Sequence, residues 1–196
     1  MPVQVLIGMP SHGTMPTKAV MSIAGLAKNT TVMTGFLVVE GSVLPQNREI
    51  LVEWAIKERY SHLFFLDSDI LCDGDTINRL LAHNLEIVGA PYNKRSTPSY
   101  PVVMEKRENG EIGSVGKFGK MPEELFSAYA QGLGCVLIDL KVFDKIERPY
   151  FAFVYSPGGV LIHGEDIHFF EQATKAGIKN WVDPTIKVRH IGEAIY

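Results

Sequence analysis

Short apolar runs alternate with longer segments of helical character over the first 90 residues of the chain. The apolar, β-branched runs predict strands, and they are residues 3–9, 31–39, 63–66 and 86–89. The segments between them predict helices, and they are residues 16–28, 44–57 and 76–83. Pro16 and Pro45 fall in the first turns of two of these helices, where proline is well tolerated. This order predicts right-handed βαβ units and a mostly parallel sheet.

The regular alternation of strand and helix patterns ends after Gly89. Residues 91–101 are rich in turn formers, and Asn109-Gly110 between the apolar runs 102–105 and 112–115 predicts a β-hairpin. The elements expected beyond it are a strand at 134–140, a short helix at 142–146, a helix at 165–177, and strands at 181–182 and 186–190. Residues 151–159 are aromatic and then glycine-rich, which predicts a mobile loop. We therefore expect one α/β domain whose second half is mixed.

The strand at 63–66 runs into Asp67-Ser68-Asp69, which places two carboxylates one residue apart. In an extended backbone such residues point to the same side, and their charges repel each other unless a cation lies nearby. Carboxylate oxygens suit Mg²⁺ or Mn²⁺, which keep waters and bind a substrate diphosphate. Open α/β sheets also bind ligands at the carboxyl ends of their strands. The pattern predicts a metal–nucleotide site, and an acidic turn before the next helix is the alternative.

Composition narrows the class of protein only a little. Apolar residues make up 46% of the chain and charged residues 21%, which is typical of a globular protein. The formal net charge of −3 gives no overall reason to bind nucleic acid or an anionic membrane. Cys72 and Cys135 form no CxxC pair and favour a reducing compartment. With no signal sequence and no bilayer-length apolar run, we expect a cytoplasmic protein that does not use a membrane.

Three further features bear on chemistry, and each has a structural alternative. Gly132-Leu133-Gly134 precedes a predicted strand, where glycines allow positive φ and a close backbone approach, or simply a tight turn. Gly164-Glu165-Asp166 begins a predicted helix, where carboxylates also interact favourably with the helix dipole. His190 ends the last predicted strand, and a lone histidine is more often an ordinary residue than a ligand.

Taken in this order, these elements resemble the GT-A class of nucleotide-sugar glycosyltransferases. That class is marked by a DxD acid pair, a glycine loop, an xED motif and a C-terminal metal-binding histidine. The resemblance covers nearly the whole chain and implies a Rossmann-like α/β fold over residues 1–196. Residues 1–90 would be the nucleotide-binding half, and residues 91–196 the sugar and acceptor half.

The resemblance also implies a role for each matching residue. Asp69, His190 and Asp67 would hold Mn²⁺ or Mg²⁺, with Asp67 also reaching the donor ribose or a metal-bound water. Asp166 matches the carboxylate that acts as base in inverting members, which favours inversion, and retention stays the alternative because retaining members share the metal site. Glu165 would hold sugar or acceptor hydroxyls. The residues implied to bind the donor are Pro10, Ser11, His12, Glu40, Arg48, Asp67, Ser68, Gly132 and Gly134.

The function implied is transfer of a sugar from a nucleotide-diphosphate sugar to an acceptor hydroxyl. UDP-linked donors are favoured over GDP-linked ones, and the sequence fixes neither the base nor the sugar. The acceptor stays open between a saccharide, a protein, a lipid and a modified DNA base, and the short chain allows a homo-oligomer to share the acceptor site. A non-catalytic nucleotide-sugar-binding module is one alternative. A sugar-1-phosphate nucleotidyltransferase is another, although residues 8–14 lack the basic cluster usual in those enzymes.

Overall fold

A seven-stranded sheet forms the centre of the protein in a computed structural model, which describes residues 2–192. Its strand order is β2-β1-β3-β10-β5-β13-β8. The strands of this sheet are β1 (Gln4–Ser11), β2 (Met33–Glu40), β3 (His62–Leu66), β5 (Ile87–Gly89), β8 (Phe126–Ala128), β10 (Cys135–Asp139) and β13 (Asn180–Val182). Five of them run in one direction, and β10 and β8 run the opposite way. The expected mostly parallel α/β fold is confirmed.

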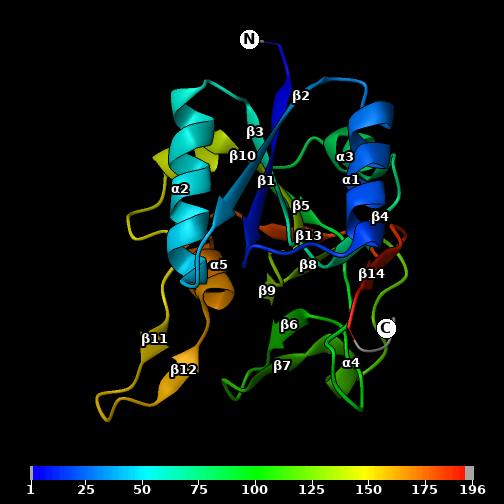
Figure 1. The fold of residues 1–196 in the computed structure, drawn as a ribbon. Coiled ribbons are helices and arrows are strands. Elements are labelled where there is room, and N and C mark those ends of the chain that lie inside the picture. Colours follow the sequence, from blue (N-terminus) through cyan, green and yellow to red (C-terminus); the bar gives the residue numbers. More distant parts are fainter. Residues whose placement is uncertain (1, 193–196) are drawn as a thin grey trace.

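Helices cover both faces of the sheet (Figure 1). The helices are α1 (Thr17–Asn29), α2 (Leu44–Lys57), α3 (Thr76–Ala82), α4 (Val115–Phe118) and α5 (Glu165–Lys175), with the 3₁₀ helix η1 (Leu140–Asp144). One apolar core lies under α2, η1 and α5, and a second lies under α1 and α3. Each core buries alternate side chains of the same strands, such as Phe65 in the first and Phe64 in the second. Residues 63–66 of β3 are buried on both faces of the sheet and are all apolar.

β10 does not follow the βαβ pattern, because it runs antiparallel to its two neighbours. It lies between β3 and β5 and pairs with both in antiparallel orientation, with Leu137 opposite Phe64 and Val88. The chain leaves β5 at the carboxyl edge of the sheet, and residues 90–134 form further elements, among them β8, before β10 begins at Cys135, opposite Leu66 at the carboxyl end of β3. It therefore enters β10 from that edge and must run backwards. Apolar patterning reports burial but not strand direction, so the sequence did not indicate this reversal.

Smaller sheets lie beyond the carboxyl edge (Figure 1). β6 (Val103–Lys106) pairs with β7 (Ile112–Ser114) and β9 (Ala130–Gln131), which confirms the hairpin expected around Asn109-Gly110. β4 (Ile70–Cys72) pairs with β14 (Val188–His190). β11 (Val154–Tyr155) and β12 (Leu161–His163) form a separate two-stranded hairpin, where the sequence indicated only a loop. No helix within residues 2–192 is both long enough and apolar enough to cross a bilayer.

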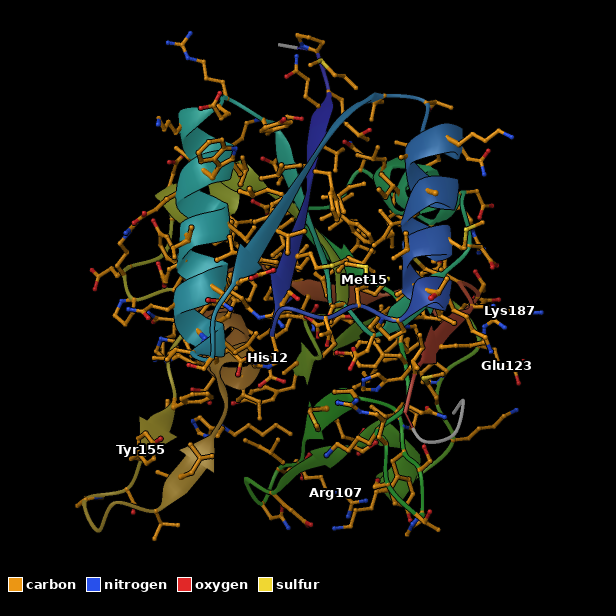
Figure 2. The ribbon with its side chains drawn as sticks, viewed as in Figure 1. His12, Met15, Arg107, Glu123, Tyr155 and Lys187 are labelled. Atoms are coloured by element: carbon orange, nitrogen blue, oxygen red, sulfur yellow. The ribbon has the colours of Figure 1, made fainter. Side chains whose placement is uncertain are left out.

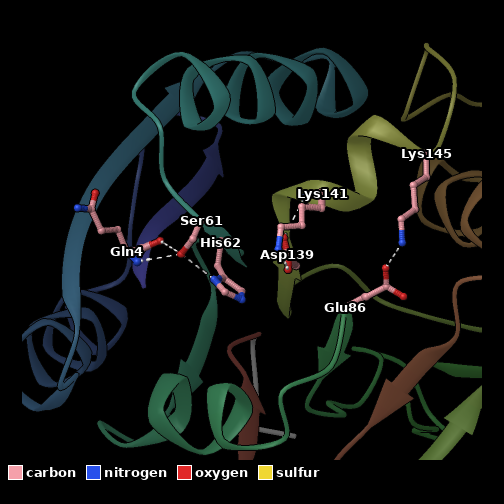
Figure 3. A network of polar contacts seen from close by, with 7 residues as sticks. All are labelled: Gln4, Ser61, His62, Glu86, Asp139, Lys141 and Lys145. Atoms are coloured by element: carbon pink, nitrogen blue, oxygen red, sulfur yellow. Dashed lines mark hydrogen bonds and ion pairs between the residues drawn. The ribbon is translucent and has the colours of Figure 1, made fainter. Parts of the chain in front are cut away.

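The opposite, amino-terminal edge of the sheet is tied together by polar contacts (Figure 3). The Ser61 hydroxyl accepts a hydrogen bond from the Gln4 backbone N–H and donates to the Gln4 carbonyl, at 2.8 and 2.9 Å. The same hydroxyl lies 2.8 Å from His62 Nδ1. Lys145 and Glu86 form an ion pair at the same edge. The Ser61 hydroxyl is hydrogen-bonded to the backbone of β1. Its contact with His62 is therefore part of the link between β1 and β3.

Candidate active site

The two aspartates of the DxD motif lie in a turn between β3 and β4. The Ile70 N–H donates to the Asp67 carbonyl at 3.1 Å, so the backbone is bent where an extended strand was expected. The carboxylates consequently contact different cations. Asp67 Oδ1 lies 3.0 Å from Arg48 Nη2, whereas Asp69 Oδ2 lies 3.0 Å from Arg95 Nη1. Ser68 is half-buried between them.

Asp69 and His190 are brought together by the pairing of β4 with β14. His190 is opposite Ile70 in this ladder, and the Ile191 N–H donates to the Asp69 carbonyl at 2.8 Å. His190 Nε2 therefore lies 3.4 Å from Asp69 Oδ2. The Asn93 carbonyl is 3.0 Å from His190 Nδ1 and can only accept, so Nδ1 carries a proton. In the neutral ring Nε2 is then the nitrogen with a free lone pair, and it points to Asp69.

This pair suits a divalent cation by its donor chemistry. An imidazole nitrogen oriented through Nδ1 and a carboxylate oxygen are both ordinary ligands of Mn²⁺. No group of three or more His, Cys, Asp or Glu side chains that could hold a metal occurs within the described residues. Cations of this class complete their coordination with waters and substrate phosphates, so two protein donors fit a cation that arrives with a diphosphate. Asp67 as a third ligand stays a prediction, because its described ion pair is with Arg48.

The pKa shifts of Asp69 and His190 agree with a direct contact between the two side chains. Burial alone would raise the pKa of Asp69, but its hydrogen bond to His190 and the nearby charges of His190 and Arg95 hold that pKa below its ordinary value. Burial alone would lower the pKa of His190, yet the contacts with Asp69 and the Asn93 carbonyl raise it. The site therefore already attracts positive charge to Asp69.

Arg48 connects the DxD turn to the xED motif from inside the protein. Its side chain is 2% exposed and extends from the first turns of α2. Its guanidinium contacts Asp67 through Nη2 and lies 3.5 Å from Glu165 Oε1 through Nε. It also packs over the Phe65 ring, 5.1 Å from the ring centroid. A buried cation of this kind holds two carboxylates close together that would otherwise repel each other.

Glu165 and Asp166 occupy the first turn of α5, at the carboxyl edge of the sheet. Asp166 Oδ1 accepts a hydrogen bond from the Ile167 N–H at 2.8 Å, which holds the carboxylate against the helix start. Burial raises the pKa of both carboxyl groups, and Arg48 partly opposes the rise in each. A carboxylate with a raised pKa is a better proton acceptor than an ordinary aspartate, which suits the base role expected for Asp166.

The glycine loop is shaped by close packing under Tyr92. A Cβ at Gly134 would lie 2.7 Å from Asp67 Oδ2 and 2.8 Å from the Tyr92 hydroxyl, and one at Gly132 would lie 2.2 Å from that hydroxyl. The Gly134 N–H donates to the Tyr92 hydroxyl at 3.1 Å. Neither glycine adopts the positive φ that the residue type allows. Glycine is required here because the aspartate and the tyrosine approach the backbone closely. Contact of this loop with a sugar stays a prediction.

Gly134→Ala should therefore disturb the DxD turn directly. The added methyl group must displace Asp67 or Tyr92, and overpacking of this kind costs about 1–3 kcal/mol of stability. Gly119→Ala is the matched control, because a Cβ at Gly119 meets nothing within 4 Å and its φ of 175° suits any residue. Urea unfolding of both variants measures the difference. Equal stability of the two would contradict the close packing described here.

The four remaining donor candidates lie at the carboxyl ends of β1 and β2. Ser11 is opposite Glu40 in the parallel ladder, and the Ser11 carbonyl accepts from the Gly41 N–H at 3.1 Å. Pro10 and Ser11 are buried, whereas His12 and Glu40 are exposed. The fold thus gathers them at the same edge of the sheet as Asp67, and donor binding by each stays a prediction.

Tyr92, Asn93 and Arg95 belong to the site but were not singled out from the sequence. The Tyr92 ring packs edge-on against the His190 ring at 5.3 Å between centroids, and Asn93 orients the histidine. They lie in the segment that follows β5. The available signal was their place after a predicted strand end, because ligand-binding residues of parallel sheets gather at that edge. The turn-rich composition of residues 91–101 indicated only a loop, so this position after a strand end was not used to predict site residues.

Comparison with known proteins identifies the fold. No protein-family model and no curated protein matches this sequence. The structure is similar to the crystal structure of A197 from STIV, with a TM-score of 0.65 and 21% identity over 97% of this chain and 86% of that chain. It is also similar to that of GalNAc-T7 with UDP, GalNAc and Mn²⁺, with a TM-score of 0.65 and 13% identity. That match covers 97% of this chain and 44% of the GalNAc-T7 chain. At these identities the likeness shows a GT-A-like fold alone.

Proposed function

We propose that the protein is a metal-dependent glycosyltransferase that moves a sugar from a nucleotide-diphosphate sugar to an acceptor hydroxyl. The observation that carries the proposal is the link through Arg48 between Asp67 and Glu165. It joins the acid pair at the end of β3 to the carboxylates at the start of α5, and the Asp69–His190 pair adjoins it. The GT-A-like fold, shared with a protein crystallised with UDP, GalNAc and Mn²⁺, supports the same function.

In the proposed reaction the chain binds the nucleoside with Pro10, Ser11, His12 and Glu40 at the ends of β1 and β2. Asp69 and His190 would hold a divalent cation, and such a cation would neutralise charge on a departing diphosphate. Arg48 keeps Asp67 and Glu165 in fixed positions, and Glu165 holds sugar or acceptor hydroxyls.

Asp166 supplies the proton transfer in this scheme. As the bond from the anomeric carbon to the diphosphate breaks, the nucleoside diphosphate leaves with the electron pair. The acceptor oxygen forms the new bond on the opposite face of the anomeric carbon, and its proton passes to Asp166. The configuration is therefore inverted. UDP bound in GalNAc-T7 supports a uridine donor over a guanosine donor for this protein.

The decisive measurement is UDP binding by calorimetry in Mn²⁺ and in EDTA, with transfer or hydrolysis of UDP-sugars measured alongside. Wild-type protein should bind UDP at least about tenfold more tightly with Mn²⁺, and Asp69→Asn or His190→Ala should remove most of that difference, because each takes away one cation ligand. Asp73→Asn and His168→Ala are matched controls outside the site and should retain it.

Equal UDP affinity in Mn²⁺ and EDTA for the wild-type protein would contradict the metal site. Metal-dependent binding of UDP-sugars, with neither transfer nor hydrolysis across saccharide, protein, lipid and DNA acceptors, would instead indicate a non-catalytic binding module.

A further inference from the structure

The hairpin of β11 and β12, with Phe153 before it, forms a projecting segment that we call the apolar finger (residues 153–163). β11 pairs with β12 alone, and the hairpin extends away from the body of the protein (Figure 1). Residues 151–162 contain no Asp, Glu, Lys or Arg. Five large apolar side chains in the finger are 42–68% exposed, and they are Phe153, Tyr155, Val160, Leu161 and Ile162.

The finger exposes apolar side chains on both of its faces. Val160 and Leu161 are consecutive and precede the register shift of the hairpin, so they point to opposite sides, yet they are 68% and 52% exposed. Its tip is an ordered turn, in which the Ser156 N–H donates to the Val160 carbonyl at 2.8 Å and the Ser156 hydroxyl accepts from the Val160 N–H at 3.1 Å. The finger is therefore a defined element that exposes apolar side chains on both faces.

A second protein molecule is a poor fit for this surface. A standard protein–protein interface buries about 800 Å² on each partner. A partner docked on one face of the finger leaves the apolar side chains of the other face in water. A lipid layer covers both faces and the tip together. From Phe153 to Pro157 the extended chain spans about 13 Å, which reaches the depth of ~5–10 Å that interfacial segments occupy in a membrane.

Charge around the finger favours an anionic lipid layer. Residues 94–120 contain six Lys and Arg and three Glu, a formal charge of +3, and the whole chain is −3, so the remainder carries −6. β6, β7 and α4, which belong to this basic segment, lie at the same end of the molecule as the finger (Figure 1). Arg107 and Tyr155 both project at that end (Figure 2). The net charge of −3 for the whole chain does not show that residues 94–120 are basic while the remainder is acidic.

We propose that the apolar finger inserts into the surface of an anionic lipid layer, with the basic segment 94–120 against the lipid headgroups. This departs from the expectation that the protein does not use a membrane, because an interfacial hairpin needs no membrane-spanning helix. The finger continues through Gly164 into Glu165 and Asp166, so docking brings the candidate active site to the lipid surface. The inference goes beyond the proposed function and does not depend on it.

Co-sedimentation with vesicles tests the proposal, in the absence of any nucleotide sugar. The vesicles contain phosphatidylcholine with or without phosphatidylglycerol. Wild-type protein should bind the mixed vesicles, and added salt should weaken that binding. The double variant Leu161→Ser/Ile162→Ser should bind at least about tenfold more weakly, because it removes most of the apolar surface of β12. Val20→Ser/Met21→Ser is the matched control, since this adjacent pair on α1 is 49% and 68% exposed.

The control pair should bind as the wild-type protein does, and both variants should keep the wild-type melting temperature. Absence of vesicle binding by the wild-type protein would overturn the proposal, as would equal losses in the two double variants. Sedimentation velocity provides a separate check. Self-association of the wild-type protein that the finger variant loses, without vesicle binding, would assign the finger to a second copy of the chain and also overturn the proposal. A lack of transferase activity would leave the vesicle result unaffected.

Discussion

Asp166→Asn is expected to lower turnover by roughly two to four orders of magnitude, the usual effect of removing a positioned base. Asparagine keeps the size of the side chain and can still accept the hydrogen bond from the Ile167 N–H, so α5 should begin as before. It cannot take the proton of an acceptor hydroxyl. Donor affinity should change little, because the proposed diphosphate contacts lie on Asp69 and His190. Steady-state kinetics and calorimetric UDP binding on one preparation measure both quantities.

The pH profile gives a second test of the same residue. Burial raises the pKa of Asp166 above its ordinary 3.8, so wild-type turnover should fall as the pH drops through that raised pKa, where the base becomes protonated. Asp166→Asn should lose this acid limb. Asp75→Asn, which changes a carboxylate at the start of α3, should retain both turnover and profile. Near-normal turnover in Asp166→Asn would exclude the base role and favour a retaining mechanism or another base.

Arg48→Met is expected to destabilise the protein by about 3–5 kcal/mol at neutral pH, because removing one partner of a buried ion pair leaves the other uncompensated. Here Asp67 and Glu165 both lose their shared cation. The Asp67 side chain is 27% exposed and keeps some hydration, which places the loss toward the lower end of the range. Urea unfolding at pH 7 measures the change. Lys145→Met is the matched control, because it removes an exposed ion pair with Glu86 and should cost less than about 1 kcal/mol.

The deficit of Arg48→Met should also depend on pH in a defined direction. Without the arginine, burial raises the folded-state pKa of Glu165 further above its unfolded value. A carboxyl group shifted in that direction destabilises the folded state as the pH rises above the unfolded pKa, and it has no such effect when protonated in both states. The difference from wild type should therefore shrink toward about pH 4 and grow toward neutral pH. A deficit that is equal at both pH values would show that lost packing, not charge, explains the effect.

Part of the candidate site follows from local pattern. Asp67 and Asp69 end an apolar run and Glu165 and Asp166 begin an amphipathic one, so each pair is placed at a strand or helix end by periodicity alone. The partners of these residues could not be predicted in the same way. The family resemblance implied that Arg48 binds the donor, and only the packing of α2 against β3 shows it as a buried link between two carboxylates.

The sequence by itself determined the strands β1, β2, β3 and β5 with the helices between them, the apolar faces these elements bury and the residue types available at the carboxyl edge of the sheet. These depend on periods of two and 3.6 residues and on turn chemistry, which are local properties. Only the tertiary structure decided the reversed direction of β10, the pairing of β4 with β14 that places His190 beside Asp69, and the exposure of the apolar finger. Each depends on contacts between residues far apart in the chain, and hydrophobic patterning is the same whichever distant segment provides the contact.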